Sequence, residues 1–181
     1  MALNPGAAQR WVWRHPRPEG VTGLCIGAGS DPPVHWRRAK RLARRIQAHA
    51  RRQRLAHEVI TSPLSRCADV GAWLARWGWR HRTDVRLLEL DFGAWDGRRW
   101  DDIGAAALAA WTDDFLQHRP GGGESLAALL ARCAAWPEVD ASVVGHGGWM
   151  LARRWLAQHP SEPPTAARWP APPRYGEAWQ L

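Results

Sequence analysis

The chain has 181 residues, and 25 Lys plus Arg against 17 Asp plus Glu give it a formal net charge of +8 and an isoelectric point near 11. This length suits one well-buried domain, residues 1–181, and is short for two. With 45% hydrophobic and 23% charged residues the composition is globular, which excludes collagen, coiled-coil and wholly disordered classes.

The cysteines and the apolar runs indicate the cellular compartment of the protein. Cys25, Cys67 and Cys133 lie far apart and form no CxxC pair, which argues against a disulfide framework or a zinc site and for a reducing compartment. Residues 1–10 lack the apolar core of a signal peptide, and the longest apolar run, 103–111, is far shorter than the ~20 residues of a membrane helix. We therefore expect a cytoplasmic protein outside the membrane.

The positive charge is concentrated in one stretch. Residues 37–54 carry nine basic and no acidic side chains, so the rest of the chain holds 16 basic against 17 acidic residues. Such a run raises nucleic acid as a partner. A solvated helix face has the same composition, and Trp36 is the one aromatic residue beside the run, so nucleic-acid binding is the less favoured interpretation.

Four short segments rich in β-branched or aromatic residues predict strands at 11–14, 58–61, 85–90 and 141–144. Between the first two, apolar residues from Trp36 to Ala50 recur at steps of three and four, which predicts a helix. Ser62 and Pro63 have the N-cap and first-turn residue types of a second helix. Alternating strands and helices predict an α/β three-layer sandwich, in which helices flank a mostly parallel central sheet.

The second half of the chain predicts further helices over about 98–118, 124–136 and 149–158. The glycines at 121–123 break the first pair; with Glu124 and Ser125 they are either a loop with a helix N-cap or part of the functional site. Six prolines predict an irregular segment at 159–174, and residues 175–181 can return as an edge strand.

Polar residues follow the carboxyl ends of the predicted strands, where sheets of this class bind ligands. The first strand runs into Arg14 and His15, the second into a segment that ends at Arg66, and the fourth into His146. The third predicted strand carries Glu89 near its carboxyl end. Two histidines, two arginines and a carboxylate are therefore expected at one edge of the sheet.

This set of residues suits phosphoryl transfer. Arg14 and Arg66 supply guanidinium groups, whose donors match phosphate oxygens. The neutral imidazole of His15 is a competent nucleophile towards phosphorus, and the neighbouring arginines disfavour its protonated form.

Two further residues complete the chemistry. His146 precedes Gly147 and Gly148 at a helix start, so its ring and the first helical amides can bind the same anion. Glu89 can give a proton to the departing alkoxide. The tryptophans are expected to be mostly core residues, although Trp95 and Trp149 lie close enough to these motifs to line a pocket for an aromatic substrate. Asp91 and Asp96 are expected to be loop and turn residues.

The motifs resemble, in order and spacing, those of the histidine phosphatase superfamily, which has a phosphoglycerate mutase-like fold. They span residues 11 to about 155: Arg14-His15, Ser62-Pro63-Leu64-Ser65-Arg66, Glu89 with Phe92-Gly93-Ala94-Trp95-Asp96-Gly97, Pro120-Gly121-Gly122-Gly123-Glu124-Ser125, and His146-Gly147-Gly148. The short chain and the Phe-Gly-x-Trp-Asp-Gly segment are most similar to the alpha-ribazole phosphatase branch of cobalamin synthesis. So is Leu24-Cys25-Ile26-Gly27, which leads to Asp31-Pro32-Pro33.

The resemblance implies that His15 is transiently phosphorylated and that Arg14, Arg66 and His146 hold the phosphoryl group. Glu89 is then the proton donor and afterwards the base for water. The resemblance also implies no metal and no cofactor, and the eight histidines, never closer than eight residues, offer no HxH or HExxH ligand pair.

The implied substrate is a phosphorylated small molecule. Alpha-ribazole 5′-phosphate is the first candidate, and a broad-specificity sugar or nucleotide phosphatase is the alternative. A non-catalytic protein that only binds phosphorylated ligands is less favoured, because neither the nucleophile nor the acid is missing.

One departure from the family pattern lies beside the nucleophile. The family has glycine directly after the histidine and threonine two residues further on, whereas this chain has Pro16 and Pro18. Proline lacks a backbone N–H, so neither an amide nor a threonine hydroxyl from these positions can contact phosphate.

Overall fold

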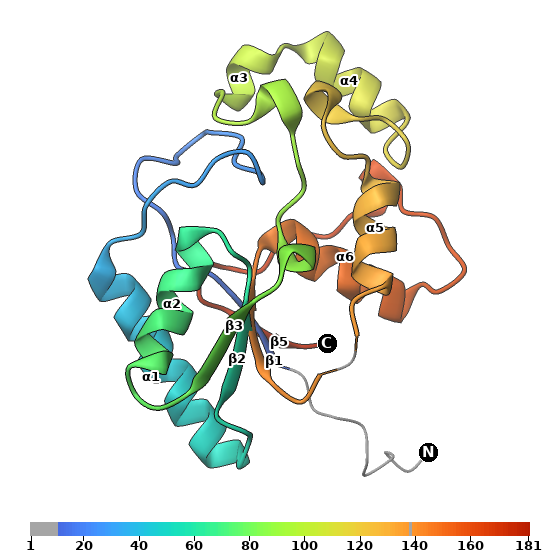
Figure 1. The fold of residues 1–181 in the computed structure, drawn as a ribbon. Helices are drawn as coiled ribbons and strands as arrows, with labels where there is room; N and C mark the ends of the chain where they lie inside the picture. Colours follow the sequence, from blue (N-terminus) through green and yellow to red (C-terminus); the bar gives the residue numbers. More distant parts are fainter. Residues whose placement is uncertain (1–10, 138) are drawn as a thin grey trace.

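The computed structural model describes residues 11–137 and 139–181. Its sheet has the strand order β3-β2-β4-β1-β5 (Figure 1). Strands β1 (Trp11–Arg14), β2 (Glu58–Thr61), β3 (Arg80–Thr83) and β4 (Ser142–Gly145) are parallel, and β5 (Ala178–Gln180) runs antiparallel to β1 at the edge. The predicted mostly parallel α/β sheet is confirmed, as are the strands at 11–14 and 58–61 and the C-terminal edge strand.

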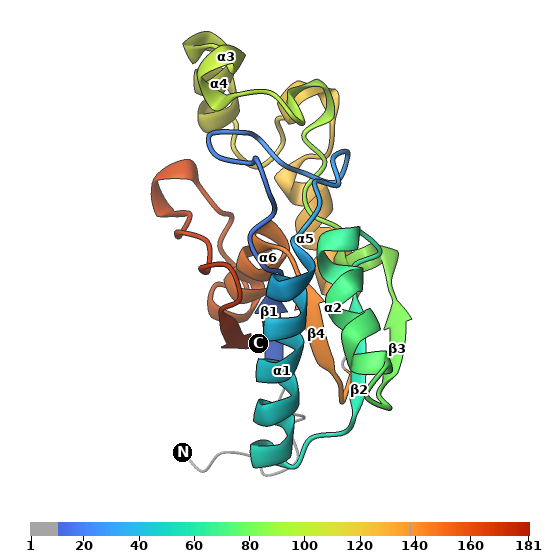
Figure 2. The ribbon, with the colours of Figure 1, turned by 90° about the vertical axis from the view of Figure 1, so that its left-hand side faces the viewer.

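Helices cover both faces of the sheet. Helices α1 (Trp36–Gln53) and α2 (Ser65–Ala75) lie on one side, and α5 (Leu126–Ala134) and α6 (Gly147–Gln158) on the other (Figures 1 and 2). Neighbouring strand residues point to opposite faces. Trp13, Val59 and Val144 therefore join the α1/α2 core, while Val12, Ile60 and Val143 join the α5/α6 core. The three-layer arrangement is confirmed.

The third strand is not where the pattern predicts it. β3 occupies Arg80–Thr83, whereas the predicted strand at 85–90 begins with a single 3₁₀ turn, Val85–Leu87, which the Asp84 side chain caps. β3 is an edge strand with mostly exposed polar side chains, so it lacks a hydrophobic signal. Leu87 is buried without being in a strand, which misled the prediction.

The predicted start of the second helix at Ser62 and Pro63 is also wrong. Ser62 donates its backbone N–H to the carbonyl of Val144 at 3.1 Å, which keeps it with the sheet. Helix α2 begins at Ser65, and its N-cap residue, Leu64, provides no side-chain hydrogen bond. Ser62 therefore extends the hydrogen bonding of the sheet instead of capping helix α2, as its residue type had predicted.

The remaining helices follow the predictions with one division. The helix predicted at 98–118 is split into α3 (Trp100–Ile103) and α4 (Ala105–Asp113) by Gly104, whose φ of +91° interrupts the helix. Both lie beyond the carboxyl edge of the sheet, at the top of Figure 1. Residues 159–174 are irregular apart from one 3₁₀ turn, Ala166–Arg168.

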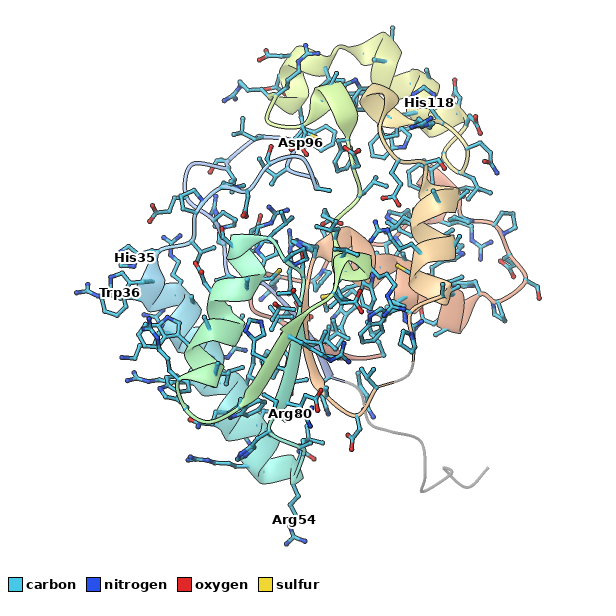
Figure 3. The ribbon with its side chains drawn as sticks, viewed as in Figure 1. His35, Trp36, Arg54, Arg80, Asp96 and His118 are labelled. Carbon is cyan, nitrogen blue, oxygen red and sulfur yellow. The ribbon has the colours of Figure 1, made fainter. Side chains whose placement is uncertain are left out.

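Helix α1 carries the basic run on its outer surface. Its arginines are exposed, and His35 and Trp36 project to solvent at its start (Figure 3). The ammonium group of Lys40 lies 4.6 Å from the ring centre of Trp73 on α2, so part of the charge packs on a neighbouring tryptophan. In the described ranges, no helix is both long and apolar enough to cross a membrane.

Candidate active site

Two neighbouring strands bring the predicted histidines together. β1 pairs with β4 in a register that sets Arg14 opposite Gly145, so His15 and His146 follow the two strands side by side. Their ring centroids are 5.0 Å apart, and both side chains are buried. The contact joins residues that are far apart in the chain.

The backbone determines the tautomer of His15. Its Nδ1 lies 2.8 Å from the carbonyl oxygen of Pro16. A carbonyl can only accept, so Nδ1 carries the proton and Nε2 of the neutral ring keeps its lone pair. Burial, and then the charges of Arg66 and Arg14, lower the pKa of His15 from 6.5 to about 3, although the Pro16 hydrogen bond opposes this. Proline at position 16 thus retains the carbonyl that orients the nucleophile.

These buried neutral rings predict a stability that depends on pH. Burial, the repulsion that a protonated His146 and a protonated His15 would exert on each other, and the charge of Arg66 hold the pKa of His146 well below 6.5. An unfolded histidine binds a proton below about pH 6.5, whereas folded His15 does not until about pH 3. Stability is therefore fully present above pH 6.5. It is expected to fall below that value by about 1.4 kcal/mol per pH unit for each such histidine.

Urea unfolding between about pH 7.5 and pH 5 measures this slope, above the range in which most carboxylates titrate. His15→Gln removes one of the two rings and should make the slope shallower. A slope that is the same in both proteins would show that His15 does not contribute.

Both ring nitrogens of His146 contact neighbouring side chains. Nδ1 lies 3.4 Å from Nε of Arg66, which can only donate, so the proton of the neutral ring is on Nε2. Nε2 faces Sγ of Cys67 at 3.5 Å, and that thiol faces the carbonyl of Gly145. Burial raises the pKa of Cys67, so it remains a thiol. His146 therefore braces Arg66 in the state described.

Arg66 is fixed by a loop. It is the second residue of α2 and only 1% exposed. Nη1 donates to the carbonyl of Ser30 at 2.5 Å and Nη2 to that of Gly27 at 2.7 Å, and the Asp31 carboxylate lies 3.5 Å from Nη1. Each Nη carries a second N–H. The side chain is thus held rigidly while donors remain for an anion.

Asp96 orders this loop. Its two carboxylate oxygens accept hydrogen bonds from the backbone N–H groups of Gly27 and Gly29 and from the Ser30 hydroxyl. Figure 3 shows Asp96 next to this loop. Sequence reasoning treated Asp96 as a turn residue and missed this supporting role, because the bond spans more than 60 residues.

Arg14 is positioned by the C-terminal segment. Nη1 donates to the carbonyl of Pro173 at 2.6 Å, and Cζ lies 4.0 Å from the ring centre of Tyr175. The Tyr175 ring is also 5.5 Å from the ring of His15. Nε of Arg14 is buried and has no hydrogen-bond partner within the described ranges. An unpaired buried donor is costly, which favours an acceptor at this position. The sequence contained no signal for Tyr175.

Glu89 faces the same space as Arg14. Its Oε1 accepts the N–H of Leu90 at 3.0 Å, and its Oε2 accepts that of Gly148 at 3.1 Å. A Cβ atom at Gly148 would collide with Oε1, and one at Gly147 would lie 3.2 Å from the Arg14 guanidinium carbon. The two glycines at the start of α6 therefore make room for the carboxylate and the cation.

The segment around the glycines at 121–123 supports the site from outside. The Ser125 hydroxyl accepts a backbone N–H in the first turn of α5, and Glu124 pairs with Arg132 at 2.7 Å. Arg132 also donates to the carbonyl of Leu88 at 2.8 Å, next to Glu89. These contacts agree with the interpretation of the motif as a loop with an N-cap.

A cavity of about 430 Å³ opens beside Arg14 and Glu89, and Gly147 and Gly148 form part of its wall. The prediction that Trp95 and Trp149 line a substrate pocket is wrong. Trp149 is fully buried in the α5/α6 core, and Trp95 is buried with Cys25 behind rings that line the cavity, among them Trp111. Other aromatic residues line the cavity.

All five predicted residues converge at one end of the sheet. His15, His146 and Arg66 form a buried cluster, and Arg14 and Glu89 join it from the cavity side. For the part of the chain that the structure describes, there is no group of three His, Cys, Asp or Glu side chains that could hold a metal. A site with two imidazoles, two guanidinium groups and a carboxylate is typical of proteins that bind and transfer phosphoryl groups.

Comparison with known proteins gives the family. The model of the histidine phosphatase superfamily (branch 1) matches residues 11–167. The chain therefore belongs to this superfamily and is a phosphatase enzyme by family. No curated protein matches the chain.

Solved structures share the fold. A mycobacterial glucosyl-3-phosphoglycerate phosphatase in complex with VO3 is 25% identical over 95% of this chain and 91% of its own, with a TM-score of 0.71. The alpha-ribazole phosphatase from Shigella flexneri is 21% identical over 94% and 88%, with a TM-score of 0.68. A protein from Thermus thermophilus is 25% identical over 82% and 85%, with a TM-score of 0.63.

Proposed function

We propose that this protein hydrolyses phosphomonoesters in two steps through a phosphohistidine on His15. In the first step Nε2 forms a bond to phosphorus, the bond to the ester oxygen breaks, and Glu89 gives that oxygen a proton. In the second step Glu89 takes a proton from water, whose oxygen attacks phosphorus and releases His15. The observation that carries the proposal is the hydrogen bond between Nδ1 of His15 and the carbonyl of Pro16, which leaves Nε2 of the neutral ring unprotonated near two arginines.

The positive groups match the charge of the transferred group. A phosphoryl group has about two negative charges near neutral pH, and Arg14 and Arg66 supply two guanidinium groups beside His15. The buried, unpaired Nε of Arg14 is suited to an acceptor. The amide of Gly147 at the start of α6 is proposed as a further donor. So is the Nε2–H of His146, which would exchange its contact with Cys67 for one with the anion.

For the substrate we propose alpha-ribazole 5′-phosphate, in the cytoplasm. The support is the similarity of the Phe92–Gly97 segment and of the short chain to that branch. A sugar phosphatase is the second candidate, because the mycobacterial protein of the same fold is a glucosyl-3-phosphoglycerate phosphatase.

The first test is the turnover of p-nitrophenyl phosphate in the presence of EDTA. In the second test the protein reacts with a ³²P-labelled phosphate ester and the reaction is stopped rapidly. We expect undiminished turnover in EDTA and label on the protein that is stable to alkali and lost in acid, as a phosphohistidine is. Loss of turnover in EDTA, or failure to trap label when turnover is present, would contradict the mechanism. A comparison of kcat/KM for alpha-ribazole 5′-phosphate with that for glucosyl-3-phosphoglycerate decides between the two substrates.

A further inference from the structure

The cavity beside Glu89 and Arg14 has an aromatic wall. Its volume is about 430 Å³, within the range of sites for small organic ligands. Six aromatic side chains, from five separate parts of the chain, contribute to the lining: Phe92, Trp100, Trp111, Phe115, Trp169 and Tyr175.

Most of these rings hold one another in place. Trp100 and Trp111 lie parallel, 6.3 Å apart, and Phe92 meets both at close to 90°. Phe115 lies between Trp111 and Trp169, at 5.7 and 5.8 Å. Offset and edge-on pairs of this kind are favourable, so the wall is ordered before a ligand arrives.

The rest of the lining is almost free of charge. Among the described lining residues, Arg14 and Glu89 are the two that are charged, and the others besides the rings are aliphatic side chains, prolines and glycines. If Arg14 binds the phosphoryl group, no lining cation is left for an acidic leaving group. A buried carboxylate without a partner is strongly unfavourable, and sugar hydroxyls would lose hydrogen bonds to water.

We infer, on the basis of the proposed phosphatase function, that this cavity selects substrates whose leaving group is an uncharged, flat aromatic ring system. The ring packs against Trp111 and its neighbours while the ester oxygen faces Glu89. Acidic leaving groups, such as those of phosphoglycerates, are disfavoured. Alpha-ribazole 5′-phosphate carries such a ring system on its ribose, and the inference does not require it to be the substrate.

The test compares three phosphate esters of primary alcohols with similar leaving-group basicity: 2-(1-naphthyl)ethanol, n-butanol and 3-hydroxypropionate. We expect kcat/KM to be about tenfold or more higher for the naphthyl ester than for the butyl ester, because more apolar area is buried. The carboxylate ester should be about tenfold or more lower than the butyl ester. Equal values for all three esters, or a preference for the carboxylate, would overturn the inference.

Variants of Trp111 test whether the aromatic wall causes the preference for the naphthyl ester. Trp111→Leu keeps an apolar side chain but removes the flat ring, so the ratio of kcat/KM for naphthyl over butyl ester should fall about tenfold, mainly through KM. Trp111→Phe should restore most of this ratio. Trp73→Leu, on α2 outside the cavity, is the matched control and should leave it unchanged. An equal loss for both esters in Trp111→Leu would mean that the residue is merely structural.

Binding separates this inference from the phosphatase function itself. Calorimetry with non-hydrolysable 2-(1-naphthyl)ethylphosphonate and butylphosphonate needs no turnover. Tighter binding of the naphthyl compound by a protein that hydrolyses none of the esters would uphold the cavity assignment and contradict the proposed function. Equal binding of the two phosphonates would overturn the cavity assignment, whatever the turnover.

Discussion

Replacing His15 by alanine is expected to lower kcat/KM for every phosphomonoester by about a thousandfold or more. The variant lacks the only protein atom proposed to form a bond to phosphorus, and what remains is binding by Arg14 and Arg66. The measurement is hydrolysis of p-nitrophenyl phosphate, together with the amount of ³²P trapped on the protein. Full activity in the variant would exclude a phosphohistidine at this position.

Two further variants separate chemistry from folding. His15→Gln retains a polar side chain in the buried space and should be as inactive as His15→Ala. His49 is the matched control, since it is a buried histidine that packs against Trp11 and Trp13, away from the cavity. His49→Gln should remain active. Circular dichroism checks that all three variants fold.

Replacing Glu89 by glutamine is expected to have an effect that depends on the leaving group. Benzyl phosphate and p-nitrophenyl phosphate have similar shapes, but benzyl alkoxide is a much poorer leaving group and needs a proton. We expect kcat/KM to fall about a hundredfold or more for benzyl phosphate and less than about tenfold for p-nitrophenyl phosphate. Equal losses would remove Glu89 from the acid role.

The design isolates proton donation. kcat/KM reports only the steps up to departure of the alcohol, so a role of Glu89 in activating water does not enter. The amide also loses one of the acceptors that bind Leu90 and Gly148, but this disturbance affects both esters alike. Glu162→Gln, an exposed carboxylate paired with Arg168, is the control and should leave both rates unchanged.

The success of the strand predictions depended on burial. β1, β2 and β4 lie inside the sheet, where apolar side chains face helices on both sides, and their hydrophobic segments identify them correctly. β3 lies at the edge and reads Arg-His-Arg-Thr, so it had no such signal. The error did not misplace Glu89, because the extended chain after Leu87 still carries it to the carboxyl edge.

The reactive side chains of the site could be predicted from the sequence, but the groups that orient them could not. Arg14 is the last residue of β1, and His15 and His146 directly follow strands. Residues at strand ends meet at one edge in any parallel sheet. The groups that orient them come from elsewhere. The Pro16 carbonyl fixes the His15 tautomer, Asp96 orders the loop that holds Arg66, and Tyr175 lies under Arg14. Such bonds leave no spacing pattern in a single chain.

The sequence alone predicts the class of fold, the family resemblance and the reactive residues. It can do so because hydrophobic periodicity and strand-end motifs are local properties of the chain. Which rings line the cavity depends on the packing of the folded chain. Trp111 and Trp169 lie far apart in the sequence and meet through Phe115. Trp149 is buried in the α5/α6 core, and Trp95 lies behind the wall, edge-on to Trp111 at 5.9 Å. The physical reason is that burial depends on which faces of different helices pack together, and one chain's local pattern does not contain that choice.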